Sequence, residues 1–412
     1  MEIANRATLV VLPPPARAAP DARTSSGEPC LLGLSLIERA GLAGRRAGYD
    51  RIFLLGRDRA VPPAVRAIAD WNELAVALSS SQAATLVIAP ATIVAETEWL
   101  MRLARMRIAP AAWAAIPNRI VALAETVVPD ALSLLQADGG AFDMTALEQR
   151  LGRRFGPAAA MPAGIDPLVV ARPENIPAAE RHLLGALVKD TDGFMARHVD
   201  RRISLQISRR LARTGITPTQ VTIISMVIGL VGASFFLSAH WVWQAAGALL
   251  FLLHSIVDGC DGELARLKFQ ESKFGGLLDF WGDNIVHVAI FACLAFGWAS
   301  STAAIWPLWF GASAIIGTLG SAGLVYWKQL RPKEDGGPLF TSVSGVGDDR
   351  LSRMLDAAAR RDFVYAVPIL ALFGKANWFL LLAAVGAPIF FLLLVVLALR
   401  ERLQSKALTS AT

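Results

Sequence analysis

Long apolar runs dominate the chain from Thr219 onward, whereas the preceding part reads as a soluble, Ala- and Arg-rich protein. A helix that spans a bilayer needs roughly 20 predominantly apolar residues. Runs of about this length follow one another, and the last two merge around Gly374–Asn377. They are Thr219–Ala239, Trp241–Ala265, Gly276–Ala299, Ala304–Trp327, Ala357–Phe373 and Asn377–Leu399. The pattern predicts an all-α domain with six transmembrane helices over residues 216–402.

Short apolar runs alternate with helical patterns in the first part of the chain. The predicted buried strands are Thr8–Leu12, Arg51–Leu55, Thr85–Ala89 and Leu168–Ala171. The predicted helices are Gly33–Ala47 and Ala64–Leu78. Strand, helix and strand at this spacing indicate a parallel sheet covered by helices. We therefore expect an α/β, Rossmann-like domain over residues 1–178.

An amphipathic helix is predicted between the two domains, over residues 190–215. Its apolar residues recur every fourth position as Val199, Ile203, Ile207 and Leu211. Six arginines crowd the rest of its surface: Arg197, Arg201, Arg202, Arg209, Arg210 and Arg213. A basic amphipathic helix next to a membrane span typically lies at the lipid surface. The alternative is a solvated helix that packs on the N-terminal domain.

Charge and cysteine content refine the class of protein. The chain is 54% hydrophobic and 18% charged with a net charge of +6, and its three cysteines form no CxxC pair. Neither nucleic acid nor a cysteine zinc site is indicated. Lys and Arg are absent from the loops near His240 and Ser300, and the loop near Lys375 carries one. The others lie in the Leu267–Phe274 loop, the Lys328–Arg361 segment and the C-terminal tail. The first thirty residues lack the basic start and apolar core of a secretory signal peptide. Together with the distribution of Lys and Arg, this favours a bacterial inner membrane protein with both termini in the cytoplasm.

Four aspartates interrupt the apolar pattern. Asp258 and Asp261 lie near the end of the second run, and Asp279 and Asp283 lie near the start of the third. On a helix, Asp258 and Asp261 are separated by roughly 60°, and residues four apart lie one above the other. A tight connection would make the two helices antiparallel neighbours, so that all four carboxylates converge. Such a cluster needs cations and is the oxygen-only site that Mg²⁺ or Mn²⁺ prefers, with room for two ions.

Small and basic residues accompany the acids. Gly262 and Ala265 fall on the helix face of Asp258 and Asp261, where they leave room for a ligand. Arg266 follows at the helix end, where its planar guanidinium can hold a phosphate. The composition of this segment indicates a phosphorylated substrate beside the metal ions.

These residues carry a family resemblance. The pattern Asp258-x-x-Asp261-Gly262-x-x-Ala265-Arg266, then Gly275-x-x-x-Asp279-x-x-x-Asp283, resembles the signature of the CDP-alcohol phosphotransferases. The resemblance implies a six-helix fold, usually a homodimer, in which the acids hold two metal ions. It also implies that Asp283 deprotonates an acceptor hydroxyl, which attacks the CDP donor and releases CMP. The CDP-binding residues would be Asp261, Gly262, Ala265, Arg266 and Gly275.

Other candidates surround this motif. His254 and His287 lie one turn from Asp258 and Asp283 and could contact substrate or a carboxylate, although hydrogen-bonded interior histidines are commoner. Lys328, Arg331 and Arg361 could bind the acceptor, including a phosphorylated one. Topology-setting charge is the alternative for these three.

The N-terminal domain resembles sugar-nucleotide transferases through Gly33–Ala40 and Gly48–Gly56. Their glycine-rich phosphate loop is replaced by the proline-rich segment Pro13–Arg17, and prolines have no N–H to offer. Their acidic metal ligand is replaced by the segment Pro90–Thr92. We expect this domain to be non-catalytic.

The sequence thus predicts an integral-membrane phosphotransferase that uses CDP-diacylglycerol or a CDP-polyol donor and an alcohol acceptor. One alternative is a bifunctional enzyme that also makes its own CDP-polyol, such as CDP-inositol, from CTP. A second alternative is a divalent-cation transporter that uses the acidic cluster.

Overall fold

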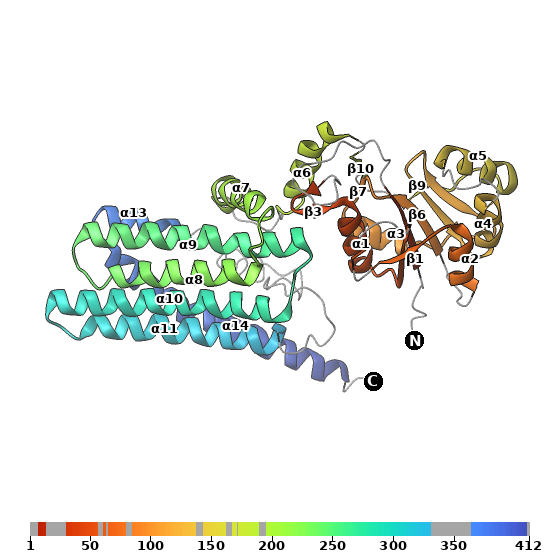
Figure 1. Ribbon diagram of the computed structural model, residues 1–412. Helices are drawn as coiled ribbons and strands as arrows, with labels where there is room; N and C mark the ends of the chain where they lie inside the picture. Colours follow the sequence, from red (N-terminus) through yellow and green to blue (C-terminus); the bar gives the residue numbers. More distant parts are fainter. Residues whose placement is uncertain are drawn as a thin grey trace. The chain divides into compact units, whose positions relative to one another are not determined.

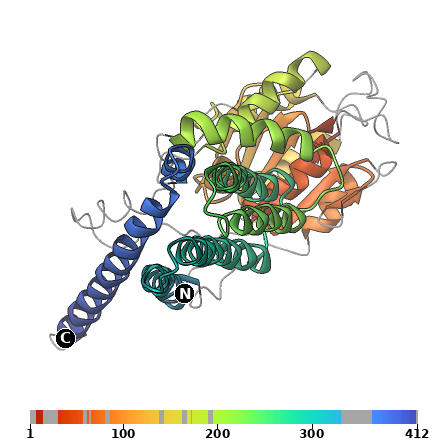
Figure 2. The same cartoon turned by 90° about the vertical axis from the view of Figure 1, so that its left-hand side faces the viewer.

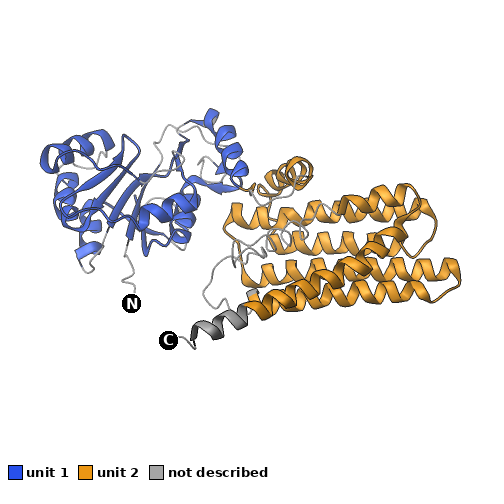
Figure 3. Ribbon diagram, turned by 180° about the vertical axis from the view of Figure 1, so that it is seen from behind, with its two compact units in different colours: residues 1–186 blue, residues 187–412 orange. Residues whose placement is uncertain are grey.

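The chain forms two compact units, residues 1–186 and 187–412 (Figure 3). A computed structural model describes residues 7–13, 30–56, 61–62, 65–79, 85–136, 143–161, 167–170, 172–188, 195–330 and 364–409. Each unit has its own hydrophobic core, one around the strands of the first unit and one between the helices of the second. The two units are therefore described separately.

The first unit is built on a mixed sheet of six strands in the order β5-β4-β1-β6-β9-β8 (Figure 1). The strands are β1 (Ala7–Leu12), β4 (Arg51–Leu55), β5 (Arg66–Ile68), β6 (Thr85–Pro90), β8 (Trp113–Ile116) and β9 (Ile120–Ala124). The first four are parallel, with Thr8 opposite both Arg51 and Leu86, whereas β9 runs antiparallel to β6 and to β8. Every residue of β1 is buried, as expected for a parallel strand covered on both faces.

Six helices accompany this sheet. They are α1 (Leu36–Arg46), α2 (Trp71–Ser79), α3 (Thr97–Ala104), α4 (Val128–Gln136), α5 (Met144–Phe155) and α6 (Ile176–Gly185). α1 begins with a capping box, in which the Ser35 hydroxyl accepts from the Glu38 N–H and the Glu38 carboxylate accepts from the Ser35 N–H. The predicted α/β class is confirmed, because a parallel-rich sheet carries helices between its strands.

Three details of the predicted sheet are wrong. The hairpin β8–β9 makes the sheet mixed rather than parallel. The segment predicted as a helix from Ala64 begins with β5, and α2 starts only at Trp71, because the Asp70 carboxylate accepts from the Glu73 N–H and caps the helix there. The last predicted strand is only Leu168–Val169 (β10), which pairs with β7 (Ile93–Val94) in a separate two-stranded sheet.

The second unit is helical. Its helices are α7 (Arg201–Leu211), α8 (Pro218–Phe235), α9 (Trp241–Lys268), α10 (Lys273–Thr302), α11 (Trp306–Val325), α13 (Ala366–Leu372) and α14 (Ala376–Thr409). Single π-helical turns, Ala196–Asp200 and Tyr326–Leu330, precede α7 and follow α11. Thr217 caps α8 in a capping box with Gln220, and Pro218 is its first residue.

Five helices of the described chain, namely α8, α9, α10, α11 and α14, are long and apolar enough to cross a bilayer. The predicted fifth span, Ala357–Phe373, is described only from Val364 onward, where it contains α13. Exposed tryptophans near the α8–α9, α10–α11 and α13–α14 connections form the kind of belt that marks a membrane interface: Trp241, Trp243, Trp306, Trp309 and Trp378. The protein is therefore an integral membrane protein.

Glycines let the helices approach closely. A Cβ atom on Gly232 of α8 would lie 3.0 Å from the Gly247 carbonyl oxygen of α9, and one on Gly247 would lie 2.7 Å from the Gly232 oxygen. On the other side of α8, a Cβ atom on Gly282 of α10 would lie 2.7 Å from the Met226 sulfur. Close backbone approach through small residues is typical of membrane helices. α8 consequently packs along both α9 and α10 (Figure 1).

Helix α7 runs across the bundle rather than along it. Figure 1 shows α7 end-on and α8–α11 lengthwise, whereas Figure 2 shows α7 lengthwise and α8–α11 nearly end-on. An orientation across the spanning helices is the one expected of a helix that lies in the plane of the membrane surface.

Candidate metal and phosphotransfer site

The four aspartates lie on the two helices that the sequence indicated. Asp258 and Asp261 are near the C-terminal end of α9, and Asp279 and Asp283 are in the first part of α10. The expected direct pairing of these two helices is wrong, since α9 and α10 make little contact and α8 packs against both of them. The acids nonetheless approach one another near the end where α9 and α10 are joined.

Three of the four carboxylates form a tight cluster. One oxygen each of Asp258, Asp261 and Asp279 lies within 4.8 Å of the others, and it is the only such group of acids, histidines or cysteines among the described residues. Asp258 and Asp261 are buried, with 3% and 7% of their surface exposed. Buried like charges at this spacing are unfavourable unless a cation neutralises them. A donor set made only of oxygens fits a hard divalent cation, so the three residues suit a metal ion of that kind.

Asp283 lies outside this group of three. Its Oδ1 is 3.5 Å from Nε2 of His254, and its side chain keeps 21% of its surface exposed. The Nδ1 atom of His254 lies 2.8 Å from the Ser225 carbonyl oxygen, so this buried ring is held between α8 and α10. Of the two histidine candidates, His254 therefore contacts the Asp283 carboxylate, whereas His287 Nδ1 lies 2.7 Å from the Asp283 backbone oxygen.

A threonine of α8 completes the surroundings of Asp261. The Thr222 hydroxyl donates to Oδ2 of Asp261, and the Gly262 N–H is directed to Oδ1 of the same carboxylate. Thr222 and the neighbouring Ser225 are buried on the face of α8 that meets α9. The sequence analysis missed both residues, although two hydroxyls three positions apart within an apolar run were a usable signal.

The predicted CDP-binding residues differ in what surrounds them and in how far they are buried. A Cβ atom on Gly262 would lie 3.4 Å from an Nη atom of Arg266, so the guanidinium group occupies the space beside this glycine. Ala265 is buried, and the Gly275 N–H donates to the Ser272 hydroxyl at the start of α10. Of the acceptor candidates, Lys328 follows α11, and Arg331 and Arg361 lie outside the described residues.

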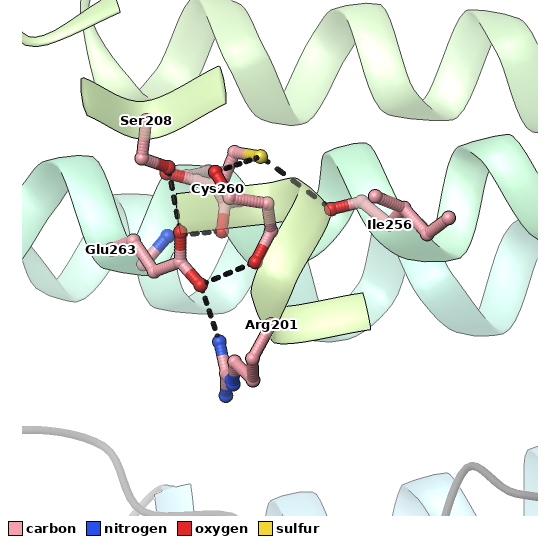
Figure 4. A network of polar contacts seen from close by, with 8 residues as sticks. Arg201, Ser208, Ile256, Cys260 and Glu263 are labelled. Carbon is pink, nitrogen blue, oxygen red and sulfur yellow. Dashed lines mark hydrogen bonds and ion pairs between the residues drawn. The ribbon is translucent and has the colours of Figure 1, made fainter. Parts of the chain in front are cut away.

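A further buried carboxylate, that of Glu263, lies on the same helix as Asp258 and Asp261. Glu263 of α9 is fully buried, and Figure 4 shows its carboxylate facing residues of α7. It accepts from Arg201 Nη1, the Ser204 hydroxyl and the Ser208 hydroxyl, each at 2.7 Å. The spacing along α9 places this residue on a different face from Asp258. The partners were missed because they precede Glu263 by 55 to 62 residues.

The contacts of α7 decide which of its faces meets the bundle. Ser204, Ser208 and Ala212 are buried against α9, whereas Ile203 of the apolar stripe is 43% exposed and Ile207 is only partly buried. The stripe therefore remains available to lipid, and the polar residues make the intramolecular contact. This arrangement favours the membrane-surface interpretation of the helix.

Comparisons with known proteins agree with the site. Residues 215–397 match the model of the CDP-alcohol phosphatidyltransferase family. "Bifunctional IPC transferase and DIPP synthase" of Thermococcus kodakarensis is 37% identical over 158 residues, which are 38% of this chain and 34% of that protein. Phosphatidylinositol phosphate synthase of Mycobacteroides abscessus is 32% identical over 115 residues, which are 27% of this chain and 51% of that protein.

A solved structure extends the comparison. The crystal structure of Mycobacterium tuberculosis phosphatidylinositol phosphate synthase with CDP-DAG bound is 25% identical and covers 46% of this chain and 92% of that chain, with a TM-score of 0.31. The matched part spans about a third of the length of the Thermococcus relative. Residues 215–397, which contain the acidic cluster, therefore form a domain that belongs to the CDP-alcohol phosphatidyltransferase family.

Proposed function

We propose that this protein is a membrane-embedded phosphotransferase that moves a substituted phosphate group from a CDP-linked donor to an alcohol and releases CMP. The observation that carries the proposal is the cluster of the buried Asp258 and Asp261 with the partly buried Asp279, inside a domain that matches the family model. Acidic residues at membrane depth are expensive and usually mark a functional site. The reaction gives these carboxylates a use that a purely structural role would not.

Asp283 is the proposed base. Its carboxylate is more exposed than those of Asp258 and Asp261, so an acceptor hydroxyl can approach it. A hydroxyl becomes a competent nucleophile when a nearby carboxylate takes its proton. The hydroxyl oxygen then forms a bond to the β-phosphorus of the donor, the bond between this phosphorus and the CMP oxygen breaks, and the proton resides on Asp283. His254 contacts Oδ1 of Asp283 and thereby orients the carboxylate.

Asp258, Asp261 and Asp279 would hold Mg²⁺ or Mn²⁺, with Asp283 contributing to a second ion. When bound, such cations supply positive charge to the donor diphosphate. Thr222 and the Gly262 N–H fix the Asp261 carboxylate from the opposite side. Gly262, Ala265, Arg266 and Gly275 complete the proposed CDP site.

The donor is proposed to be CDP-diacylglycerol or a CDP-polyol. The names of the relatives, a phosphatidylinositol phosphate synthase and a bifunctional IPC transferase and DIPP synthase, support an inositol-containing substrate. Lys328, Arg331 and Arg361 are proposed to bind the acceptor. We further propose a homodimer in a bacterial inner membrane with the site and both termini on the cytoplasmic side.

Release of CMP by the purified full-length protein in liposomes tests this proposal. Each donor is offered with a panel of alcohols in the presence of Mg²⁺, and Asp283→Asn is compared with Asp50→Asn, an exposed acid of the first unit. Removal of a general base lowers the rate by about 10²–10⁴-fold. Full activity of Asp283→Asn would show that Asp283 is not the base. Divalent-ion flux without CMP formation would favour a transporter instead.

The bifunctional alternative depends on the first unit. At the end of β6 the chain carries Pro90, Ala91 and Thr92, none of which has a carboxylate to serve as the expected acidic ligand. This favours a non-catalytic role for the unit. Incubation of the full-length protein with CTP and inositol phosphate tests it, since pyrophosphate release would establish the second activity.

A further inference from the structure

The Glu263 carboxylate is held by an unusually complete set of donors. Arg201, Ser204 and Ser208 all belong to α7, and each of their bonds to Glu263 is 2.7 Å long. Cys260 of α9 also contacts α7, since its thiol lies 3.6 Å from the backbone carbonyl oxygen of Ser204. A buried carboxylate that receives a cation and two hydroxyls is fully satisfied and fixes the geometry of the groups around it.

Glu263 lies on the face of α9 opposite the metal-binding carboxylates. At 100° per residue, Glu263 lies about 170° from the bisector of Asp258 and Asp261. The same turn of α9 is therefore held from two sides. Thr222 of α8 binds Asp261 on one side, and the three donors of α7 bind Glu263 on the other. A rotation of α9 about its axis would move Asp258 and Asp261 and would also withdraw Glu263 from its donors.

Further polar contacts hold α7 and its flanking residues against the other helices of the second unit. The Tyr365 hydroxyl, next to α13, donates to Asp200 at the start of α7. The Lys268 ammonium at the end of α9 donates to the Thr214 oxygen at 2.7 Å and to the Ile216 oxygen at 2.9 Å, in the segment between α7 and α8. All of these contacts are polar. Apolar contacts would tolerate sliding, whereas directional bonds define one position of α7 on α9.

We infer that Glu263 is a positioning residue, whose bonds to α7 set the rotation of α9 and thereby the placement of the Asp258 and Asp261 carboxylates. The inference rests on the proposed function, because it concerns the affinity of the proposed metal site. Helix α7 thus acts as an external support of the site, although none of its side chains belongs to the acidic cluster. Residues that orient metal ligands from behind typically change metal affinity by about 10–100-fold when they are replaced.

Direct Mn²⁺ binding by the full-length protein in detergent tests this role. The free-ion signal in electron paramagnetic resonance gives the dissociation constant per folded molecule, without requiring turnover. Glu263→Gln and the double variant Ser204→Ala/Ser208→Ala are each expected to weaken Mn²⁺ binding about tenfold. Combining all three substitutions should weaken binding by less than the product of the two separate effects, because both changes act on one network of contacts. The matched controls are Glu174→Gln and Ser234→Ala/Ser301→Ala, which alter exposed residues.

Asp258→Asn separates failure of the inference from failure of the proposed function. If Asp258→Asn abolishes binding while both α7–Glu263 variants bind Mn²⁺ within twofold of the unmodified protein, the positioning role is overturned and the metal site stands. If Asp258→Asn binds normally, the metal site itself is wrong and the inference falls with it. The serine variant keeps the Arg201–Glu263 ion pair, so it can be measured even if Glu263→Gln does not fold.

Discussion

The two units differ in where their buried polar residues lie. In the first unit the buried polar residues are scattered over strands, helices and loops: Thr8, Arg39, Thr85, Thr92 and Glu180. In the described part of the second unit every buried polar residue lies on α7, α8 or α9: Ser204, Ser208, Thr222, Ser225, His254, Asp258, Asp261 and Glu263. Burying polar groups is costly in both units. Their concentration on three adjoining helices is the pattern expected where polar groups are gathered into a site, whereas the buried polar residues described in the first unit are not gathered in this way.

Loss of one clustered carboxylate should give the largest effect. Asp261→Asn removes a proposed metal ligand, and Lewis-acid stabilisation is worth several kcal/mol, so about 4 kcal/mol would correspond to roughly a 10³-fold lower rate of CMP formation. Asp50→Asn in the first unit should leave the rate unchanged. Equal rates of CMP formation for Asp261→Asn and Asp50→Asn would show that the buried carboxylate of the second unit matters no more to the reaction than an exposed one of the first.

A cavity in the core of the first unit should lower the stability of this unit and leave the rate of CMP formation unchanged. Leu86 is fully buried on β6, and Leu86→Ala is expected to lower the free energy of unfolding of this unit by about 2–5 kcal/mol. Protease sensitivity of the first unit measures this loss, with Val76→Ala, which is 72% exposed, as the control. Below the unfolding temperature CMP formation should stay normal. A parallel loss of activity would mean that the first unit supports the site.

Much of the fold and of the acidic cluster was predictable from the sequence. Apolar runs identified the spanning helices, and the spacing of Asp258, Asp261 and Asp279 identified the cluster, because both depend on short-range periodicity. The hairpin β8–β9 was missed although Pro117 and Asn118 are usual turn residues and Asn118 has a φ of 57°. The Ala-rich runs on either side of this turn show no alternation of apolar and polar residues that would indicate strands. The contact between Asp283 and His254, and that between Glu263 and α7, depend on how helices distant in sequence pack. No local pattern specifies such packing.

The bond from Thr222 to Asp261 should contribute a moderate amount. A hydrogen bond to a charged group is worth about 1.5 kcal/mol, so Thr222→Val is expected to slow CMP formation roughly tenfold. Thr302→Val is the matched control, since Thr302 is exposed and its hydroxyl bonds only a carbonyl of its own helix among the contacts described. A rate for Thr222→Val equal to that of the control would show that Asp261 needs no support from α8.

The smallest effect is expected at Tyr49 of the first unit. Its buried hydroxyl has no hydrogen-bond partner among the described residues, and burial raises the pKa of the phenol. Tyr49→Phe removes a desolvated polar group, so the free energy of unfolding should stay the same or rise by up to about 1 kcal/mol. Thermal unfolding measures the change. A loss of stability would reveal a contact of this hydroxyl and would weaken the contrast between the two units.

The bonds between α7 and Glu263 also constrain the order of events during biosynthesis. The three donors precede their acceptor by 62, 59 and 55 residues, so the ribosome completes α7 well before Glu263 exists. Until the second spanning helix has been made, α7 can rest on the bilayer through its apolar stripe and its arginines. Capture of α7 by Glu263 then coincides with the arrival of Asp258 and Asp261. Newly made protein consequently acquires the support of α9 together with the first two carboxylates of the cluster, before Asp279 on α10 is made.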